Sequence, residues 1–228
     1  MVDKKIVQLL KHLKIANLRE ALGRNSLSDI EKFIYDGYSD LLFENHNLQE
    51  TDPILVLGGY LGDSVESWLN AGASKVYVVE PVTEYFNRLE ERFMGDLRVV
   101  LFKVAVGDSN GTININIDGL KSGARISEGI SQKSTLISIS EFISKLDTFP
   151  KILEINIEGG EYPVMKNLIS EDMLSGIGTF LIQFHRYSYE DEVLRSQIRS
   201  TLSVSHEEKF CYDWVWERWD IKNGGSKQ

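Results

Sequence analysis

Apolar residues of this chain gather in short runs that alternate with helical patterns from Asp52 onward. The runs are continuous, which is typical of parallel strands that are covered on both faces. We expect strands at 54–57, 76–80, 98–106, 151–158 and 179–185, and helices at 63–70, 83–94, 162–169 and 190–202. This order of elements predicts an α/β domain built on a mostly parallel sheet.

Two segments depart from this pattern. Residues 112–118 alternate isoleucine with polar residues, and this period of two indicates a half-exposed strand, which we expect in an inserted hairpin. Residues 204–210 and 212–220 are two further strand candidates that can pair antiparallel. The chain therefore reads as five strand–helix units that finish in an antiparallel hairpin.

The N-terminal part of the chain has a helical pattern of its own. Leucine and isoleucine recur at helical spacing over residues 6–22, opposite a lysine-rich face, and Ser28 with Glu31 forms a capping box that opens a second helix. We expect residues 1–48 to form a helical extension and residues 49–228 to form the main domain. The basic helix could lie on an anionic membrane. Capping its own domain, or pairing with a second copy in a homodimer, is the favoured interpretation.

The amino-acid composition of the chain argues against several classes of protein. The chain of 228 residues carries 25 basic and 34 acidic residues, a formal charge of −9, which argues against nonspecific binding of nucleic acid. The single cysteine, Cys211, excludes an intrachain disulfide and a cysteine-based zinc site. No apolar run approaches the roughly 18 residues of a membrane span, and we see no signal-peptide pattern, so we expect a cytoplasmic location.

A glycine-rich turn after the first strand carries the first chemical signal. Gly58, Gly59, Tyr60 and Gly62 follow the apolar run at 54–57, and Glu80 ends the next strand 18 residues after Gly62. Glycines let a backbone approach a ligand closely, the following helix N-terminus offers free N–H groups, and a strand-end carboxylate can accept two ribose hydroxyls. This layout predicts a nucleoside cofactor. A nicotinamide cofactor is disfavoured because the full G-x-G-x-x-G spacing is absent.

Five segments together resemble the FkbM family of S-adenosylmethionine-dependent methyltransferases. They are the glycine turn, VYVVEP, VAVGDSNG, LEINIEGGEYPVMKNLI and LIQFHR, in the family's order between about Asp52 and Asp220. The resemblance implies a Rossmann-like class I methyltransferase fold with a seven-stranded sheet and an antiparallel last strand. It also implies S-adenosylmethionine as the cofactor, bound by residues 49–228, and O-methylation of a carbohydrate or small-molecule hydroxyl.

Within that resemblance, further residues gain expected roles. We expect Pro81 and Val82 to pack against one face of the adenine, and Ala105 and Val106 to form the other wall.

The chain also departs from the family's pattern. Val56, Asn156 and Gln183 stand where the family commonly has acids. Their neutrality reduces the attraction for a cofactor that carries a sulfonium and an ammonium. A degenerate member that binds a nucleoside or a sugar without catalysis is therefore the alternative hypothesis.

Candidate catalytic residues lie at the ends of the fourth and fifth strands. Methyl transfer to an alcohol needs an aligned acceptor and a group that removes a proton. Asn156, Glu158 and Glu161 follow the fourth strand, and His185 follows the fifth as a candidate base. Glu158, Glu161 and His185 could bind a hard divalent cation, but nothing in their spacing demands a metal.

For several other polar residues we expect no direct role in the chemistry. We expect His12, His46 and His206 to lie on the surface, and Arg125 to be an ordinary loop charge, although its loop could fold over the site.

Overall fold

The computed structural model describes residues 27–44, 46, 48–49, 51–118, 121–123, 125 and 129–222. The helix that we predict over the first 22 residues lies outside these described residues, and so does its predicted role in a dimer or at a membrane. Within the described part of the chain, no helix combines the length and the apolar character that crossing a bilayer requires.

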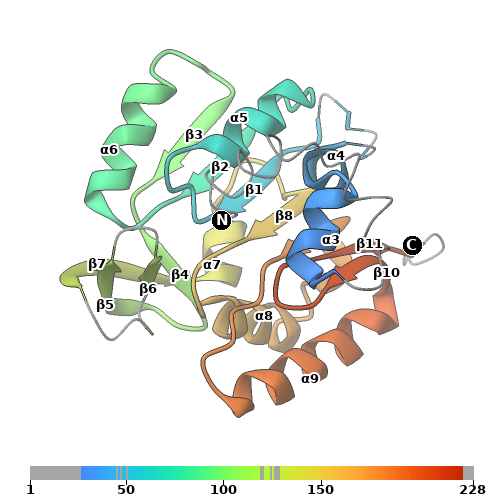
Figure 1. The fold of residues 1–228 in the computed structure, drawn as a ribbon. Helices are drawn as coiled ribbons and strands as arrows, with labels where there is room; N and C mark the ends of the chain where they lie inside the picture. Colours follow the sequence, from blue (N-terminus) through green and yellow to red (C-terminus); the bar gives the residue numbers. More distant parts are fainter. Residues whose placement is uncertain are drawn as a thin grey trace.

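A seven-stranded sheet forms the centre of the fold, in the order β10-β11-β9-β8-β1-β2-β3 (Figure 1). Its strands are β1 (Ile54–Leu57), β2 (Val76–Val79), β3 (Val99–Phe102), β8 (Ile152–Ile155), β9 (Thr179–Ile182), β10 (His206–Tyr212) and β11 (Trp216–Ile221). The neighbours β3, β2, β1, β8 and β9 are parallel, whereas β11 pairs antiparallel with both β9 and β10. The expected sheet with an antiparallel last strand is confirmed.

Helices cover both faces of this sheet, which explains the continuous apolar runs. Every residue of β1, β2, β8 and β9 is buried. Side chains such as Leu55 and Leu57 pack toward α7 (Ile139–Ser144), α8 (Glu161–Ser170) and α9 (Tyr189–Ser205). Ile54 and Val56 pack on the opposite face, toward α5 (Asp63–Asn70) and α6 (Thr83–Arg92).

The third predicted strand, 98–106, is wrong as a single element. The chain forms β3 at the edge of the main sheet, leaves the sheet at Lys103 and Val104, and then enters a second sheet as β4 (Ala105–Gly107). An apolar run cannot reveal this change of sheet, because both strands bury apolar side chains.

The second sheet has four strands in the order β4-β7-β5-β6 and lies beside α6 (Figure 1). It contains β5 (Gly111–Asp118), β6 (Lys121–Gly123) and β7 (Ile130–Ser138). The half-exposed strand predicted at 112–118 is present, paired antiparallel with β7 and with β6. The insertion is thus a small sheet that includes the expected hairpin.

The described part of the N-terminal extension packs on the main domain. The capping box of Ser28 and Glu31 begins α3 (Asp29–Tyr35), and α4 (Tyr38–Phe43) follows it. Phe33 is fully buried against the rings of Phe210 and Tyr212 from β10. The Tyr212 hydroxyl donates to Asp36 over 2.7 Å, which joins the helices to the sheet edge.

Two histidines expected on the surface are not exposed. His206 is only 1% exposed and its Nε2 lies 2.9 Å from the Ile177 carbonyl oxygen. His46 is half-buried against the Trp68 ring, where burial lowers its pKa to about 4. The surface prediction was wrong for both histidines, because residues distant in the chain cover them: Trp68 of α5 covers His46, and Phe180 and Ile177 cover His206.

Candidate functional site

A cavity of about 540 Å³ lies at the carboxyl ends of β1, β2 and β8, with the small sheet along one side. The residues that border it come from the turns after these strands, from the small sheet and from the start of α9. Carboxyl ends of parallel strands meet at one edge of a sheet, and crevices at this edge bind ligands in open α/β folds. The position predicted for the site therefore coincides with a real cavity.

Gly58 lets two strand ends approach each other closely at the cavity wall. Its φ is +92°, and a Cβ placed there would lie 2.1 Å from the Asn156 carbonyl oxygen. Any other residue would have to push β1 and β8 apart. Gly58 and Asn156 both border the cavity.

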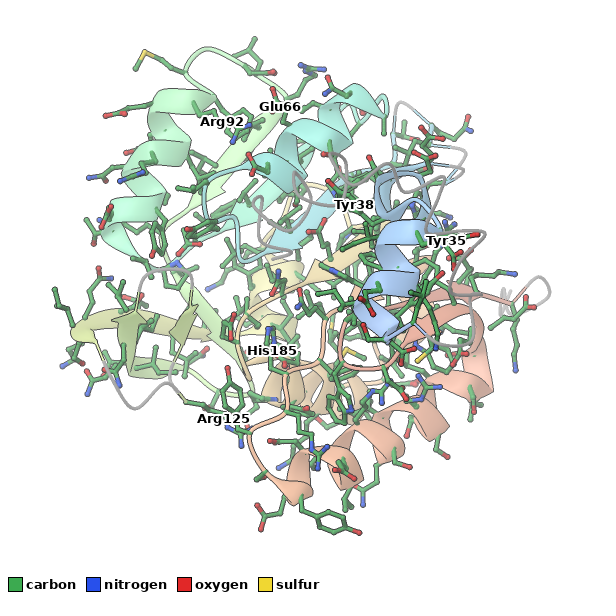
Figure 2. All side chains as sticks on the ribbon, viewed as in Figure 1. Tyr35, Tyr38, Glu66, Arg92, Arg125 and His185 are labelled. Carbon is green, nitrogen blue, oxygen red and sulfur yellow. The ribbon has the colours of Figure 1, made fainter. Side chains whose placement is uncertain are left out.

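The other two glycines of the turn have packing roles and do not border the cavity. A Cβ on Gly59 would lie 2.4 Å from Val78 Cγ1, and one on Gly62, whose φ is +88°, would lie 2.6 Å from Phe93 Cε2. The missing side chains let α6 pack closely over the turn that begins α5, and let this turn approach β2. Arg92 of α6 adds an ion pair to Glu66 of α5, as Figure 2 shows.

Glu80 sits at the centre of this wall and organises the turn. Its Oε2 accepts a hydrogen bond from the Tyr60 N–H at 2.9 Å, and its Oε1 accepts one from the Val82 N–H, also at 2.9 Å. The side chain is 5% exposed yet borders the cavity, and burial raises the pKa of this carboxyl to about 7. Each oxygen keeps a lone pair that can accept a hydroxyl.

An apolar wall continues from Glu80 onto the small sheet. It includes the predicted Pro81, Val82, Ala105 and Val106, joined by Tyr85, Ile113, Ile115 and Leu136, which we did not predict. Gln132 of β7 joins the small sheet to the segment after β2. Its amide nitrogen donates to the Pro81 carbonyl over 2.8 Å, and its oxygen accepts the Thr83 N–H over 2.9 Å. The alternation of isoleucines over 112–118 indicated a strand with one apolar face, but the sequence did not indicate that this face borders the cavity.

The predicted catalytic residues separate into two groups. Asn156 and Glu158 border the cavity, whereas Glu161 and His185 lie behind them. Glu161 is fully buried, and its Oε1 accepts the His185 main-chain N–H at 2.6 Å and lies 3.1 Å from His185 Nδ1. The other ring nitrogen, Nε2, lies 3.4 Å from Glu158 Oε1. The three side chains form a chain from the interior to the cavity: Glu161, His185, Glu158.

The opposite rim of the cavity is formed by the segment after β6 and by α9, whose contact we did not predict from the sequence. Arg125 follows β6, and its guanidinium binds Asp191 of α9 with two hydrogen bonds, of 2.5 and 3.1 Å. Figure 2 shows Arg125 between the small sheet and the loop that leads into α9. Both residues border the cavity. The loop position of Arg125 was foreseen, but its ion pair could not be, because 66 residues separate the partners.

The cavity is acidic. Five carboxylates and one guanidinium border it among the described residues: Glu80, Asp108, Glu158, Glu190, Asp191 and Arg125. The guanidinium is already paired with Asp191. No group of three or more potential metal ligands occurs in the part of the chain that the structure describes.

The neutral positions Val56 and Gln183 do not border the cavity. Val56 is fully buried in β1 and pairs in register with Glu154 of β8. Glu154 is itself buried and accepts the Trp68 indole N–H over 2.6 Å. Burial raises its pKa, and the Trp68 hydrogen bond opposes this rise.

Comparison with known proteins identifies the family of the chain. The family model of the methyltransferase FkbM domain matches residues 57–210. Two solved structures are similar to the chain at 13% identity. One is the ribosomal protein L11 methylase of Lactobacillus delbrueckii subsp. bulgaricus, with a TM-score of 0.46 over 81% of this chain and 76% of that chain. The other is Aeropyrum pernix fibrillarin in complex with natively bound S-adenosyl-L-methionine, with a TM-score of 0.47 over 81% of this chain and 73% of that chain. A search of curated proteins found no match.

Proposed function

Because this chain belongs to the FkbM family of methyltransferases, we propose that it moves a methyl group from S-adenosylmethionine to a hydroxyl of a carbohydrate or another small, uncharged acceptor. The observation that carries the choice of a hydroxyl is Glu158, a carboxylate that borders the cavity and is backed by His185 and Glu161. An alcohol must lose a proton when it is methylated, and this arrangement can take one.

The cavity wall around Gly58 and Glu80 fits the cofactor. Glu80 offers two acceptor oxygens to a ribose, the Gly58 backbone can be approached without a side chain in the way, and Val82, Ala105 and Ile115 form apolar surface for a base. When bound, S-adenosylmethionine supplies a methyl group on a positively charged sulfonium that leaves as a neutral thioether. The carboxylates of the cavity provide a favourable electrostatic environment for that positive charge.

Glu158 would act as the proton acceptor. As the acceptor oxygen forms its bond to the methyl carbon, its proton passes to the Glu158 carboxylate. Glu161, a hydrogen-bond acceptor on the Nδ1 side of His185, favours the tautomer with the proton on Nδ1. Nε2 is then free to take the proton onward from Glu158. His185, which we first considered as the base, would therefore act one step behind it.

The charge of the cavity supports an uncharged acceptor. A phosphorylated sugar or a nucleic acid would bring negative charge toward four carboxylates beyond the Arg125–Asp191 pair. Like charges in a partly enclosed site repel strongly, because less water screens them. A neutral polyol avoids this repulsion, and its hydroxyls can donate to the carboxylates.

Radiolabelled methyl transfer tests the proposal. The 228-residue chain would be incubated with methyl-labelled S-adenosylmethionine and with matched panels of neutral monosaccharides, their phosphates and RNA oligonucleotides. We expect labelled product from the neutral panel alone. Glu158→Gln should reduce turnover about a hundredfold while leaving calorimetric affinity for S-adenosylhomocysteine within twofold. Glu171→Gln, at the exposed end of α8, is the matched control and should retain turnover.

A non-catalytic member of the same fold is the second candidate. It is favoured by Asn156, whose neutral amide borders the cavity where the related motif commonly has an acid. Tight binding of S-adenosylhomocysteine without methylation of any panel member would support it. Labelled product that depends on Glu158 would exclude it.

A further inference from the structure

Glu158 has an unusual backbone conformation at the cavity. Its φ is +50°, in the left-handed region that residues with side chains rarely adopt, and Gly159 follows with a φ of +95°. Such conformations persist only where the surrounding structure holds them, and they are frequent at functional sites. The contacts that hold Glu158 therefore bear on its proposed function.

Tyr187 contacts the Glu158 carboxylate directly. Its hydroxyl donates to Glu158 Oε2 over 2.8 Å, on the oxygen that does not face His185. With one oxygen held by Tyr187 and the other beside His185, the carboxylate has a single defined orientation. Sequence reasoning missed Tyr187, because 29 residues separate it from Glu158.

Arg125 packs over both Tyr187 and the strained turn. Its guanidinium lies 5.1 Å from the centre of the Tyr187 ring, a cation–π contact. A Cβ on Gly159 would lie 2.6 Å from Arg125 Cδ and 3.2 Å from Tyr187 Cε2. The glycine therefore lets the two side chains close against the turn.

Asp191 holds both residues through one carboxylate, Arg125 by its guanidinium and Tyr187 by its main chain. It is 1% exposed, binds the Arg125 guanidinium twice, and accepts the Tyr187 main-chain N–H over 2.8 Å. Asp191 thus joins the segment after β6 to the loop before α9, and Arg125 and Tyr187 from these two segments contact the turn after β8. The position of Glu158 depends on all three.

We propose that Arg125 and Tyr187 are positioning residues that hold the Glu158 carboxylate toward the acceptor. They act through Glu158, because they restrict the rotation of its carboxylate. This inference rests on the proposed function for the role of Glu158. The geometric part, that these residues maintain its conformation, stands by itself.

Tyr187→Phe removes the hydroxyl and keeps the ring on which Arg125 stacks. With the neutral sugar that is methylated fastest as the probe, we expect kcat to fall at least about tenfold. The KM for S-adenosylmethionine should stay within twofold, because the cofactor wall is untouched. Arg125→Ala should match this loss, and Arg125→Lys should restore part of it. Tyr189→Phe, at a neighbouring tyrosine that is 73% exposed, is the control and should be unchanged.

A crystal structure of the Tyr187→Phe protein separates this inference from the proposed function, since it needs no acceptor. We expect the Glu158 side chain to leave its position beside His185. An unmoved Glu158 in Tyr187→Phe and Arg125→Ala crystals would overturn the inference, as would unchanged kcat in both variants. If no acceptor is methylated while Glu158 moves in the crystals, the proposed function fails and the positioning contacts remain.

Discussion

The two walls of the cavity are built in different ways. The wall that we assign to the cofactor comes largely from residues 58–82, and its glycine turn is held by backbone N–H groups that donate to one carboxylate, Glu80. The catalytic wall joins side chains from three distant segments, around Arg125, Glu158 and Tyr187. A wall made of backbone depends on conformation and is sensitive to an added Cβ. A wall made of side chains depends on each partner that it joins.

The largest effect is expected at the backbone-built wall. Gly58→Ala would place a Cβ 2.1 Å from the Asn156 carbonyl oxygen, which the structure can relieve only by moving β1 away from β8. We expect at least a hundredfold loss of S-adenosylhomocysteine affinity by calorimetry, together with a lower melting temperature.

Gly72→Ala is the matched control for this substitution. Gly72 has a φ of +95°, close to that of Gly58, but a Cβ there would meet nothing within 4 Å. It should cost about 1 kcal/mol of stability from backbone strain and leave cofactor affinity unchanged. Equal affinity losses in the two variants would mean that strain, not the close approach of the strands, is what matters.

A smaller effect is expected from the titration of Glu80, whose pKa burial raises to about 7. The ionised form accepts ribose hydroxyls best, so binding should release a proton and strengthen as pH rises. Between pH 6 and pH 8 we expect about a tenfold gain in S-adenosylhomocysteine affinity by calorimetry. Glu80→Gln should bind at least about tenfold more weakly at pH 8 and show no such gain. A pH-dependent affinity that persists in this variant would assign the titration to another group.

Glu154 gives the smallest effect and a reference for Glu80, because it is buried without bordering the cavity. Its raised pKa means that the folded state holds this proton more tightly than the unfolded chain. Its contribution to stability is therefore present at low pH and is lost as pH rises above the unfolded value of 4.5.

The test is Glu154→Gln, which keeps an acceptor for the Trp68 indole. It should be more stable than the natural protein by on the order of 1 kcal/mol at pH 8, with a difference that shrinks toward pH 5 in urea unfolding. A variant that is less stable at every pH would show that a charged carboxylate is needed beside Trp68.

The sequence pattern from which we predict cofactor-binding residues is local. Gly58 and Glu80 were found from their spacing alone, and both border the cavity. Gly59 and Gly62 carried the same signal, but they serve the packing of α5 and α6. A glycine that admits a ligand and one that admits a helix look identical in a sequence.

The catalytic side was predicted only in part. Glu158, Glu161 and His185 were expected at one edge of the sheet, and they do meet there. Their order from the interior to the cavity was not predictable, since it depends on how the turns after β8 and β9 fold. Tyr187 and Asp191 gave no signal, because the contacts that place them come from Arg125 and Glu158.

By itself, the sequence determined the order of strands and helices and the edge of the sheet at which Gly58 and Glu80 border a cavity. Apolar periodicity and turn glycines act between near neighbours, so they can be read along the chain. The tertiary structure alone decided that residues 98–106 divide between two sheets, and that Glu158 rather than Glu161 borders the cavity. These outcomes arise from packing between segments that lie far apart in the chain. Such packing produces no periodic pattern in the sequence of either segment.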